Sequence, residues 1–385
     1  METATLDIKD SYLKRINEFD ISNISDGLIY GKLGLLLFYL SQYEKNNDDY
    51  FLEKIALILE KIFENLKDNI EGDLYRSSSL SEGITGFAYI INFLVEEKIL
   101  DEEYLSEIKN FNSIIYETTK KSILENNFDF ISGSIGNLWY LLKIKDYKSV
   151  DLLFEILEEK SRTEEYLFYT DSENPFIDGM NFGLAHGHLG LINFLIKSID
   201  HLEKKESVKE LTQKLIDHTI KHFDFDYSID GIHIYKSYKM HLKDDELVKY
   251  QNNRLAWCNS DLTLAYILLK AGEKLQNEDY QKLAFKIGLE TTKRKDMNVT
   301  GIESDFFCHG SSGVAFLYKK IFEITQNEEF IKAYYYWIDR TMVYLEEKVE
   351  KEFDERDMSL LHGRLGSLMT IDKDINTDKY LEILI

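Results

Sequence analysis

The sequence predicts an all-α fold, a closed α/α toroid (a double-layered barrel) of seven helical hairpins, and two observations lead to it. A pair of glycines three residues apart, followed by an apolar and often aromatic run, recurs along the whole chain at intervals of about fifty residues. The 385 residues also include one proline, against roughly 5% in an average protein. Because proline interrupts helix interiors, its scarcity suits a chain that is mostly helical.

Seven such units fill the chain, so we expect a single domain over residues 1–385. In the fifth unit Ser260 and Thr263 take the two glycine positions, before the run LAYILL. The step from Gly187 to Ser260 is longer than the others and leaves room for an insertion. The six units with both glycines are Gly31/Gly34 before LLLFYL, Gly83/Gly86 before FAYIINFL, Gly133/Gly136 before NLWYLL, Gly187/Gly190 before LINFLI, Gly310/Gly313 before VAFLYKKI and Gly363/Gly366 before SLMTI.

Each unit is expected to contribute an inner and an outer helix. The runs after the glycine pairs are apolar on nearly all sides, which is typical of a buried inner layer. Charged stretches lie between these runs, for example residues 50–67, 101–125 and 204–222. Their apolar residues recur near helical spacing, which is typical of a helix with one solvent-exposed face. A closed ring of these hairpins buries the face of every unit without capping repeats.

The longer step carries a signal for β structure. Apolar residues alternate along residues 223–238, on both sides of the dipeptide Asp230-Gly231. A dipeptide of this kind between alternating runs is typical of a tight hairpin turn. The sequence therefore predicts a short β-hairpin, or an extended lid, within residues 223–238.

Composition excludes several classes of protein. A formal net charge of −23 argues against a nucleic-acid partner and against docking on an anionic membrane by charge attraction. The first ten residues lack a signal-peptide pattern, and the longest apolar run, residues 28–40, is too short to span a bilayer. With two cysteines a disulfide framework is not expected. These features predict a cytoplasmic protein with no direct membrane insertion.

The two cysteines carry the strongest signal for chemistry. Cys308 stands directly before His309 in the segment FFCHGSSG, and Cys258 lies one unit earlier in RLAWCNS. Two thiolates and an imidazole are a good ligand set for zinc, and three protein ligands leave the fourth tetrahedral position open for chemistry. The alternative is that each cysteine is a small, buried, apolar side chain.

The repeat brings these candidates together. Cys258 and Cys308 both lie two positions before the first glycine position of their units, and His309 lies one position before its own. Equivalent positions of a closed ring of repeats lie at the same end and at similar radii. Ligands that are distant in the sequence are therefore expected to meet.

Further polar residues share this end of the ring. His186 and His362 have the same position in their units as His309. His186 is a second site candidate, and its alternative is a structural histidine with satisfied hydrogen bonds. His362, His188 and the remaining histidines are expected to be structural or solvent-exposed. Asp129 and Arg254 could approach the same rim; the alternatives are a helix N-cap for Asp129 and a surface or carboxylate-pairing role for Arg254.

At this point the sequence resembles the lanthionine synthetase C-like family. The resemblance rests on LAHGHLG at residues 184–190, RLAWC at residues 254–258 and FCHGSSG at residues 307–313, together with the seven units, so it covers essentially the whole chain. It implies an α/α toroid with one zinc ion per chain in a central cavity. The residues implied are Cys258, Cys308 and His309 as zinc ligands, His186 as the catalytic acid/base, and Asp129 and Arg254 as polar residues around the site.

The chain departs from the family pattern beside the first zinc cysteine. The family commonly has a tyrosine and then a glycine after it, and this chain has Asn259 and Ser260, with Thr263 in the second glycine position. The usual hydrogen bonding and backbone geometry beside the metal are therefore not assured, although the ligand set is intact.

The resemblance implies a zinc-dependent lanthipeptide (lantibiotic) cyclase. Such an enzyme adds peptide cysteine thiols to dehydroalanine or dehydrobutyrine in the same peptide and forms lanthionine or methyllanthionine rings. Zinc would deprotonate the thiol, and His186 would protonate the enolate that forms. Asp129 would fix the tautomer or charge of His186, and Arg254 would stabilise the enolate oxygen or orient Asp129. The implied partners are a dehydrated precursor peptide with its leader, a dehydratase and an export transporter.

Two other functions stay open at this level. The chain could be a family member without cyclase activity, either a zinc protein that binds thiols such as glutathione or a scaffold in a modifying complex. An α/α-toroid glycosidase would need two catalytic carboxylates across a cleft, and it would leave the cysteines and His309 without a role.

Overall fold

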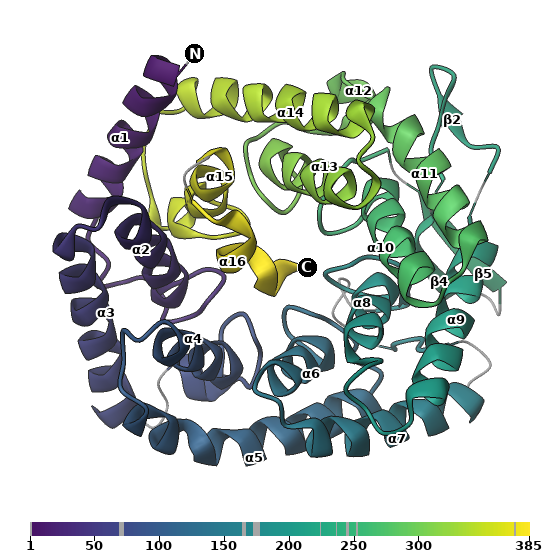
Figure 1. Cartoon of the computed structure of the whole chain (residues 1–385), viewed down its shortest axis with the longest axis horizontal. Helices are drawn as coiled ribbons and strands as arrows, with labels where there is room; N and C mark the ends of the chain where they lie inside the picture. Colours follow the sequence, from purple (N-terminus) through teal and green to yellow (C-terminus); the bar gives the residue numbers. More distant parts are fainter. Residues whose placement is uncertain are drawn as a thin grey trace.

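The computed structural model describes residues 2–68, 73–163, 167–171, 178–223, 225–235, 237–243, 246–251, 253–372 and 375–385. Its helices form two concentric layers around a common axis (Figure 1). This is the predicted α/α toroid, and the sequence prediction of the fold class is confirmed.

The inner layer consists of the helices that follow the glycine pairs. Each begins at the residue after the first glycine position, and in α2 every residue from Lys32 to Gln42 is buried. In the described part of the chain, the seven inner helices are α2 (Lys32–Asn46), α4 (Ile84–Glu96), α6 (Ser134–Lys143), α8 (His188–Ser198), α10 (Asp261–Lys274), α13 (Ser311–Thr325) and α15 (Arg364–Ile371).

The outer layer packs against the inner one, and most of its helices directly follow an inner helix. α15 is followed only by the short helices α16 (Thr377–Leu381) and η3 (Glu382–Leu384), which lie inside the ring (Figure 1). The outer helices that directly follow an inner helix are α3 (Asp49–Asp68), α5 (Glu103–Leu124), α7 (Tyr147–Thr163), α9 (Lys205–Lys221), α11 (Glu278–Thr292) and α14 (Glu328–Glu346). Shorter helices in the connections are η1 (Asp73–Arg76), α12 (Met297–Thr300) and η2 (Glu355–Met358).

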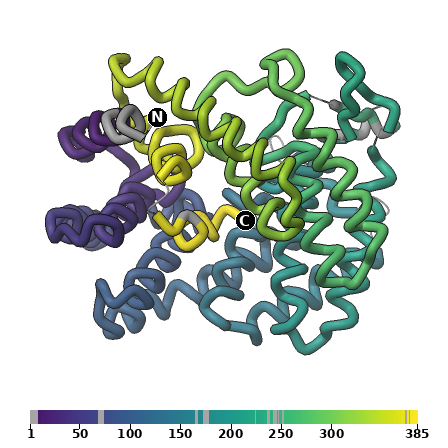
Figure 2. Tube along the Cα trace, turned by 45° about the horizontal axis from the view of Figure 1, so that its top comes forward, coloured from purple at the N-terminus to yellow at the C-terminus, as the bar shows by residue number. Residues whose placement is uncertain are grey.

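The first helix completes the outer layer. α1 (Glu2–Glu18) lies outside α15 and α2, next to α14, as both views show (Figures 1 and 2). The hydroxyl of Tyr12 donates a hydrogen bond of 2.9 Å to the carbonyl oxygen of Leu345 at the end of α14. The outer partner of the seventh inner helix therefore comes from the opposite end of the chain.

Two small sheets occupy the long step between α9 and α10. Strands β2 (Ser228–Ile229) and β3 (Ile232–His233) pair antiparallel around Asp230 and Gly231, whose φ angles of 52° and 77° are those of a tight turn with two left-handed residues. The hairpin predicted within residues 223–238 is confirmed; residues 224 and 236 lie outside the described ones.

A second sheet in this region was not predicted. It has the order β1–β4–β5, with β1 (Met180–Asn181), β4 (Ser237–Lys243) and β5 (Glu246–Gln251) all antiparallel. Within the described residues, each helix is too short or too polar to cross a bilayer.

The loops that precede the inner helices are joined to one another by backbone hydrogen bonds. In each loop, a backbone N–H group donates a hydrogen bond to a carbonyl oxygen in the loop of the next unit. The acceptor is always the residue two positions before the first glycine position of that unit. The loop of the last unit donates to the loop of the first, so the bonds close a ring. We call these seven carbonyl-bearing residues the loop ring. The bonds are Leu28 to Ser81 (2.6 Å), Ser81 to Ile131 (3.1 Å), Phe130 to Ala185 (2.9 Å), Leu184 to Cys258 (2.8 Å), Cys258 to Cys308 (3.1 Å), Cys308 to Leu361 (2.9 Å) and Leu360 to Ile29 (2.9 Å).

The second glycine of a unit permits close approach between neighbouring units. A Cβ atom at Gly136 would lie 2.3 Å from the carbonyl oxygen of Phe130 in its own loop and 2.8 Å from Cβ of Leu80 in the preceding unit. Contacts this short are far inside van der Waals distance, so this position favours glycine.

The fifth unit replaces both glycines by residues that form hydrogen bonds. The hydroxyls of Ser260 and Thr263 donate to the carbonyl oxygen of Ala256 at 2.6 and 2.7 Å. Ser260 is also the N-cap of α10, and its hydroxyl accepts the backbone N–H of Thr263 at 3.2 Å. The departures from the glycine pattern are thus accommodated by local hydrogen bonds.

Candidate functional site

The loop ring places Cys258 and Cys308 in contact. Both residues belong to it, so their backbones are hydrogen-bonded, and their thiols also form a side-chain hydrogen bond. Cys308 is buried and Cys258 is half-buried. The preceding Trp257 is fully buried, and its indole N–H donates to the carbonyl oxygen of Leu384 at 2.7 Å, which ties this loop to the C-terminal segment inside the ring.

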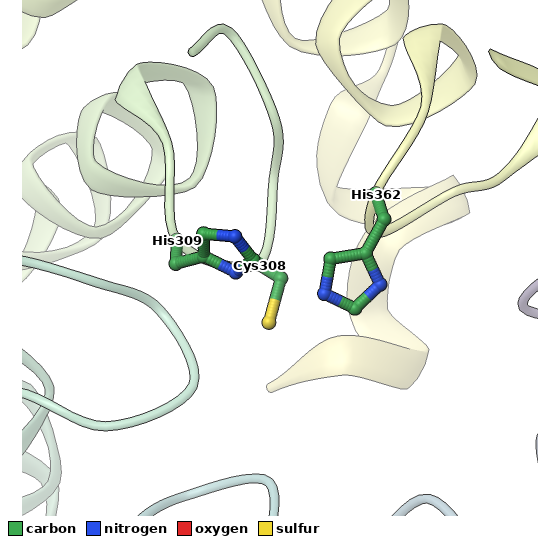
Figure 3. Close-up of side chains that lie close together, drawn as sticks. All are labelled: Cys308, His309 and His362. Atoms are coloured by element: carbon green, nitrogen blue, oxygen red, sulfur yellow. The ribbon is translucent and has the colours of Figure 1, made fainter. Parts of the chain in front are cut away.

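Two histidines lie beside Cys308. His309 follows it in the chain, and His362 comes from the loop of the neighbouring seventh unit (Figure 3). One ligand atom from each of Cys308, His309 and His362 lies within 4.8 Å of the other two, and the two imidazole centroids are 5.1 Å apart. These three residues could hold a metal ion.

The electrostatics of this cluster favour a bound cation. The hydrogen bond with Cys258, together with burial, raises the pKa of Cys308 well above its ordinary value. Burial and the nearby His362 and Arg254 lower the pKa of His309 to about 4. At neutral pH the imidazole is therefore neutral, which is the form that binds metal ions. The Cys308 thiol therefore holds its proton, because two adjacent thiols cannot both ionise without a cation to compensate their charge.

A hydrogen-bonded acid–base pair belongs to the same end of the ring. Nδ1 of His186 lies 2.5 Å from Oδ2 of Asp129, and the Asp129 side chain is 1% exposed against 26% for His186. The other carboxylate oxygen of Asp129 accepts the backbone N–H of Ser132 at 2.6 Å. Asp129 therefore caps the turn before α6, whose own N-cap is Gly133.

The charge of Asp129 governs the protonation of His186. Burial by itself lowers the pKa of His186, but the hydrogen bond to Asp129, the charge of Asp129 and the nearby Cys258 outweigh burial and raise the pKa above its ordinary value. The charge of Lys239, on β4, opposes this rise. The influence of Cys258 also shows that His186 lies near the thiols.

Arg254 is an exposed residue at the start of the loop that carries Cys258. Its positive charge lowers the pKa of both Cys308 and His309. Arg254 therefore lies close enough to the cysteine–histidine cluster to act on charge there. The structure thus brings all six residues predicted from the sequence to one end of the ring.

A cavity of about 990 Å³ adjoins the cluster on the side of His362. The hydroxyl of Tyr30, in the first unit, lies 2.9 Å from Nδ1 of His362, and the two rings are stacked. Residues that line the cavity include Tyr30, Glu82, Phe306, Arg356, His362 and Arg364.

His362 was expected to be structural or solvent-exposed, and the structure places it in the cluster with Cys308 and His309 instead. Its position in the repeat, one residue before the first glycine and equivalent to that of His309, was the signal that could have identified it. His188 is structural as expected: it is buried, and its Nε2 lies 3.1 Å from the carbonyl oxygen of Leu167.

Comparison with known proteins shows which family and fold this chain shares. The chain is 26% identical over 395 residues to the nisin biosynthesis protein NisC of Lactococcus lactis subsp. lactis, and the match covers 94% of this chain and 87% of that protein. The solved structure of a nisin cyclase is 22% identical and matches with a TM-score of 0.76 over 99% of this chain and 97% of its own, which shows the shared fold. The family model for lanthionine synthetase C-like proteins matches residues 22–385. The chain belongs to the lanthionine synthetase C-like family.

Proposed function

We propose that this protein is a zinc-dependent lanthipeptide cyclase. It would add cysteine thiols of a dehydrated precursor peptide to dehydroalanine or dehydrobutyrine of the same peptide and form thioether rings. One observation carries the proposal: the loop ring brings a cluster of thiols and imidazoles next to the hydrogen-bonded pair of His186 and Asp129. The relationship to NisC, a nisin biosynthesis protein, supports the same reaction class.

We assign Cys258, Cys308 and His309 as the zinc ligands, one ion per chain. Their chemistry fits this metal, because two thiols in mutual contact and a neutral imidazole are a set that zinc prefers. When bound, zinc supplies a Lewis acid that lowers the pKa of a peptide thiol and makes its thiolate available at neutral pH.

His186 is the proton donor of the proposed reaction. When the thiolate sulfur bonds to the β-carbon of the dehydroamino acid, the electrons of the double bond move to the carbonyl oxygen and form an enolate. The α-carbon must then take up a proton. His186 can deliver it from Nε2, because Asp129 holds Nδ1 and raises the pKa of the ring, so that the protonated form is populated near neutral pH.

Arg254 and Asp129 assist in this scheme. The guanidinium of Arg254, whose charge acts on Cys308 and His309, would stabilise negative charge on the enolate oxygen. Asp129 fixes the orientation of the His186 ring. A dehydratase that supplies the dehydrated peptide, the leader segment of that peptide, and an export transporter are the proposed partners.

The test combines metal analysis with a ring-closure assay. Purified protein should contain one zinc per chain, and Cys308→Ala should lose it. His186→Ala should keep its zinc but consume the thiols of a dehydrated peptide about 10²- to 10⁴-fold more slowly, because it lacks the proton donor. His201→Ala is the matched control, since His201 stacks on Tyr147 away from the site.

Full activity of His186→Ala would remove this residue from the mechanism, and protein without zinc after reconstitution would refute the proposed centre. The departures from the family pattern at Asn259, Ser260 and Thr263 favour the alternative of a zinc protein that binds thiols without cyclising peptides. Because Ser260 and Thr263 are accommodated by hydrogen bonds, the structure weakens that support. A zinc-loaded protein that binds glutathione but leaves peptide thiols unchanged would restore it.

A further inference from the structure

His362 lies beside two of the assigned ligands of the metal centre, Cys308 and His309. It comes from the seventh unit, and its ligand atom is within 4.8 Å of those of both Cys308 and His309. In Figure 3 one ring nitrogen of His362 faces Cys308, and the other points away from it. A centre built from Cys258, Cys308 and His309 alone would keep an open position; this side chain can close it.

Tyr30 determines which nitrogen of His362 is available. The Tyr30 hydroxyl is 2.9 Å from Nδ1, and the phenol and imidazole planes are parallel to within 2°, with centroids 5.5 Å apart. A hydrogen bond at one ring nitrogen fixes the tautomer and leaves the other nitrogen to bind a metal. The phenol oxygen of Tyr30 can accept Nδ1–H of His362, and in that tautomer Nε2 carries no proton and can bind a metal. Nε2 is therefore the ligand atom that His362 presents.

We propose that His362 is a displaceable fourth ligand: Nε2 of His362 occupies the fourth position of the metal centre while no thiol is bound, and an incoming thiol replaces it. The proposal rests on the metal centre assigned under the proposed function and adds a closed resting state to it. In the exchange, the bond from Nε2 would break, a bond from the thiol sulfur would form, and the proton of the thiol would pass to solvent water. No oxidant or reductant is required.

The cavity beside His362 supports this role. Tyr30 and His362 both line it, and at about 990 Å³ it has room for a segment of peptide. A thiol that arrives through this cavity meets His362 before it reaches Cys308. Because Nδ1 of His362 is hydrogen-bonded to Tyr30, the ring keeps a partner when Nε2 is released.

The decisive measurement uses the full chain loaded with ¹¹³Cd in place of zinc and labelled with ¹⁵N-histidine. Scalar coupling between ¹¹³Cd and a ring nitrogen identifies each ligating histidine directly and needs no substitution in the centre. We expect coupling to Nε2 of His362 as well as coupling to His309. Titration with 2-mercaptoethanol should abolish the His362 coupling and leave that of His309.

Each outcome separates this proposal from the proposed function. Coupling to His309 alone, before any thiol is added, would overturn the displaceable ligand and leave the three-ligand centre intact. Absence of coupling to any histidine would refute the metal centre itself. Persistence of the His362 coupling at saturating thiol would show a permanent ligand and would also overturn the exchange.

A variant pair provides a second measurement. In competition with a chelator, His362→Ala should bind zinc at least about tenfold more weakly than the unaltered chain, because a ligand is lost, whereas the control His201→Ala should not differ. The cobalt-loaded His362→Ala protein should bind 2-mercaptoethanol more tightly, by a similar factor, because no side chain competes for the fourth position. Equal thiol affinity in His362→Ala and His201→Ala would contradict the exchange.

Discussion

Replacement of Asp129 by asparagine should change the protonation of His186 more than any other single substitution away from the thiols. In Asp129→Asn the amide oxygen can still accept the N–H of Ser132, but the amide NH₂ group then faces Nδ1 of His186, which must accept rather than donate. A hydrogen bond to a charged acceptor contributes about 1.5–3 kcal/mol. Because the His186 side chain is 26% exposed, we use the lower half of this range.

This energy sets the size of the expected effect. Since about 1.4 kcal/mol corresponds to a factor of ten, the ratio of protonated to neutral His186 at a given pH should fall about ten- to fortyfold in Asp129→Asn. Burial, which opposes protonation, would then prevail. An NMR titration of the His186 ring, assigned by its loss in His186→Gln, measures the ratio directly. Asp217→Asn, which removes an exposed carboxylate that accepts from Tyr280, is the control.

The stability of the two proteins should differ in a pH-dependent way. Because the pKa of His186 is raised in the folded protein, its stabilising effect is fully present below the unfolded value of about 6.5 and is lost as the pH rises through the folded pKa. The gap in thermal midpoint between the unaltered chain and Asp129→Asn should therefore be largest near pH 5.5 and shrink toward pH 9. An unchanged protonation ratio, or a gap that widens with pH, would refute this reasoning.

Three further substitutions test the frame of the ring. Ser260→Ala removes the N-cap of α10 and should lower the free energy of unfolding by about 1 kcal/mol in denaturant titrations; no loss would show that the cap is dispensable. Asp261→Asn leaves the fully buried guanidinium of Arg294 without its ionic partner and should cost about 3–5 kcal/mol, most of which Asp261→Asn combined with Arg294→Met should recover. An equal loss in the double variant would speak against an unpaired charge as the cause. Gly136→Ala should cost about 1–3 kcal/mol, because the new methyl group meets a carbonyl oxygen and the side chain of Leu80; unchanged unfolding would mean that the two units can move apart freely.

The inner layer could be predicted from the sequence because its signal is local. The glycine pair, the apolar run and their repetition fix where each inner helix begins, and the structure agrees at all seven positions in the described chain. The position of Cys258, Cys308 and His309 within their repeat units likewise predicts that all three lie at one end of the ring. Their loops occupy equivalent places, and the backbone hydrogen bonds of the loop ring bring those places into contact.

Features that depend on closure of the ring could not be predicted from local sequence patterns. α1 supplies the outer helix next to α15, which follows it by more than three hundred residues, and no repeat signal connects the two. The contact between Tyr30 and His362 likewise joins the first unit to the last. The sheet that contains β1, β4 and β5 depends on a strand of two residues, which is too short to show a period.

The loop ring has a consequence for how this fold can change its chemistry. Its bonds join main-chain groups only, so the positions of the loops do not depend on which side chains the residues before the glycines carry. Tyr30, His186, His309 and His362 occupy four equivalent places of this kind, and the roles proposed for them differ. A substitution at one of these places leaves the main-chain groups of the loop ring unchanged. The chemistry of this end of the ring can therefore change while the bonds that hold its loops together are kept.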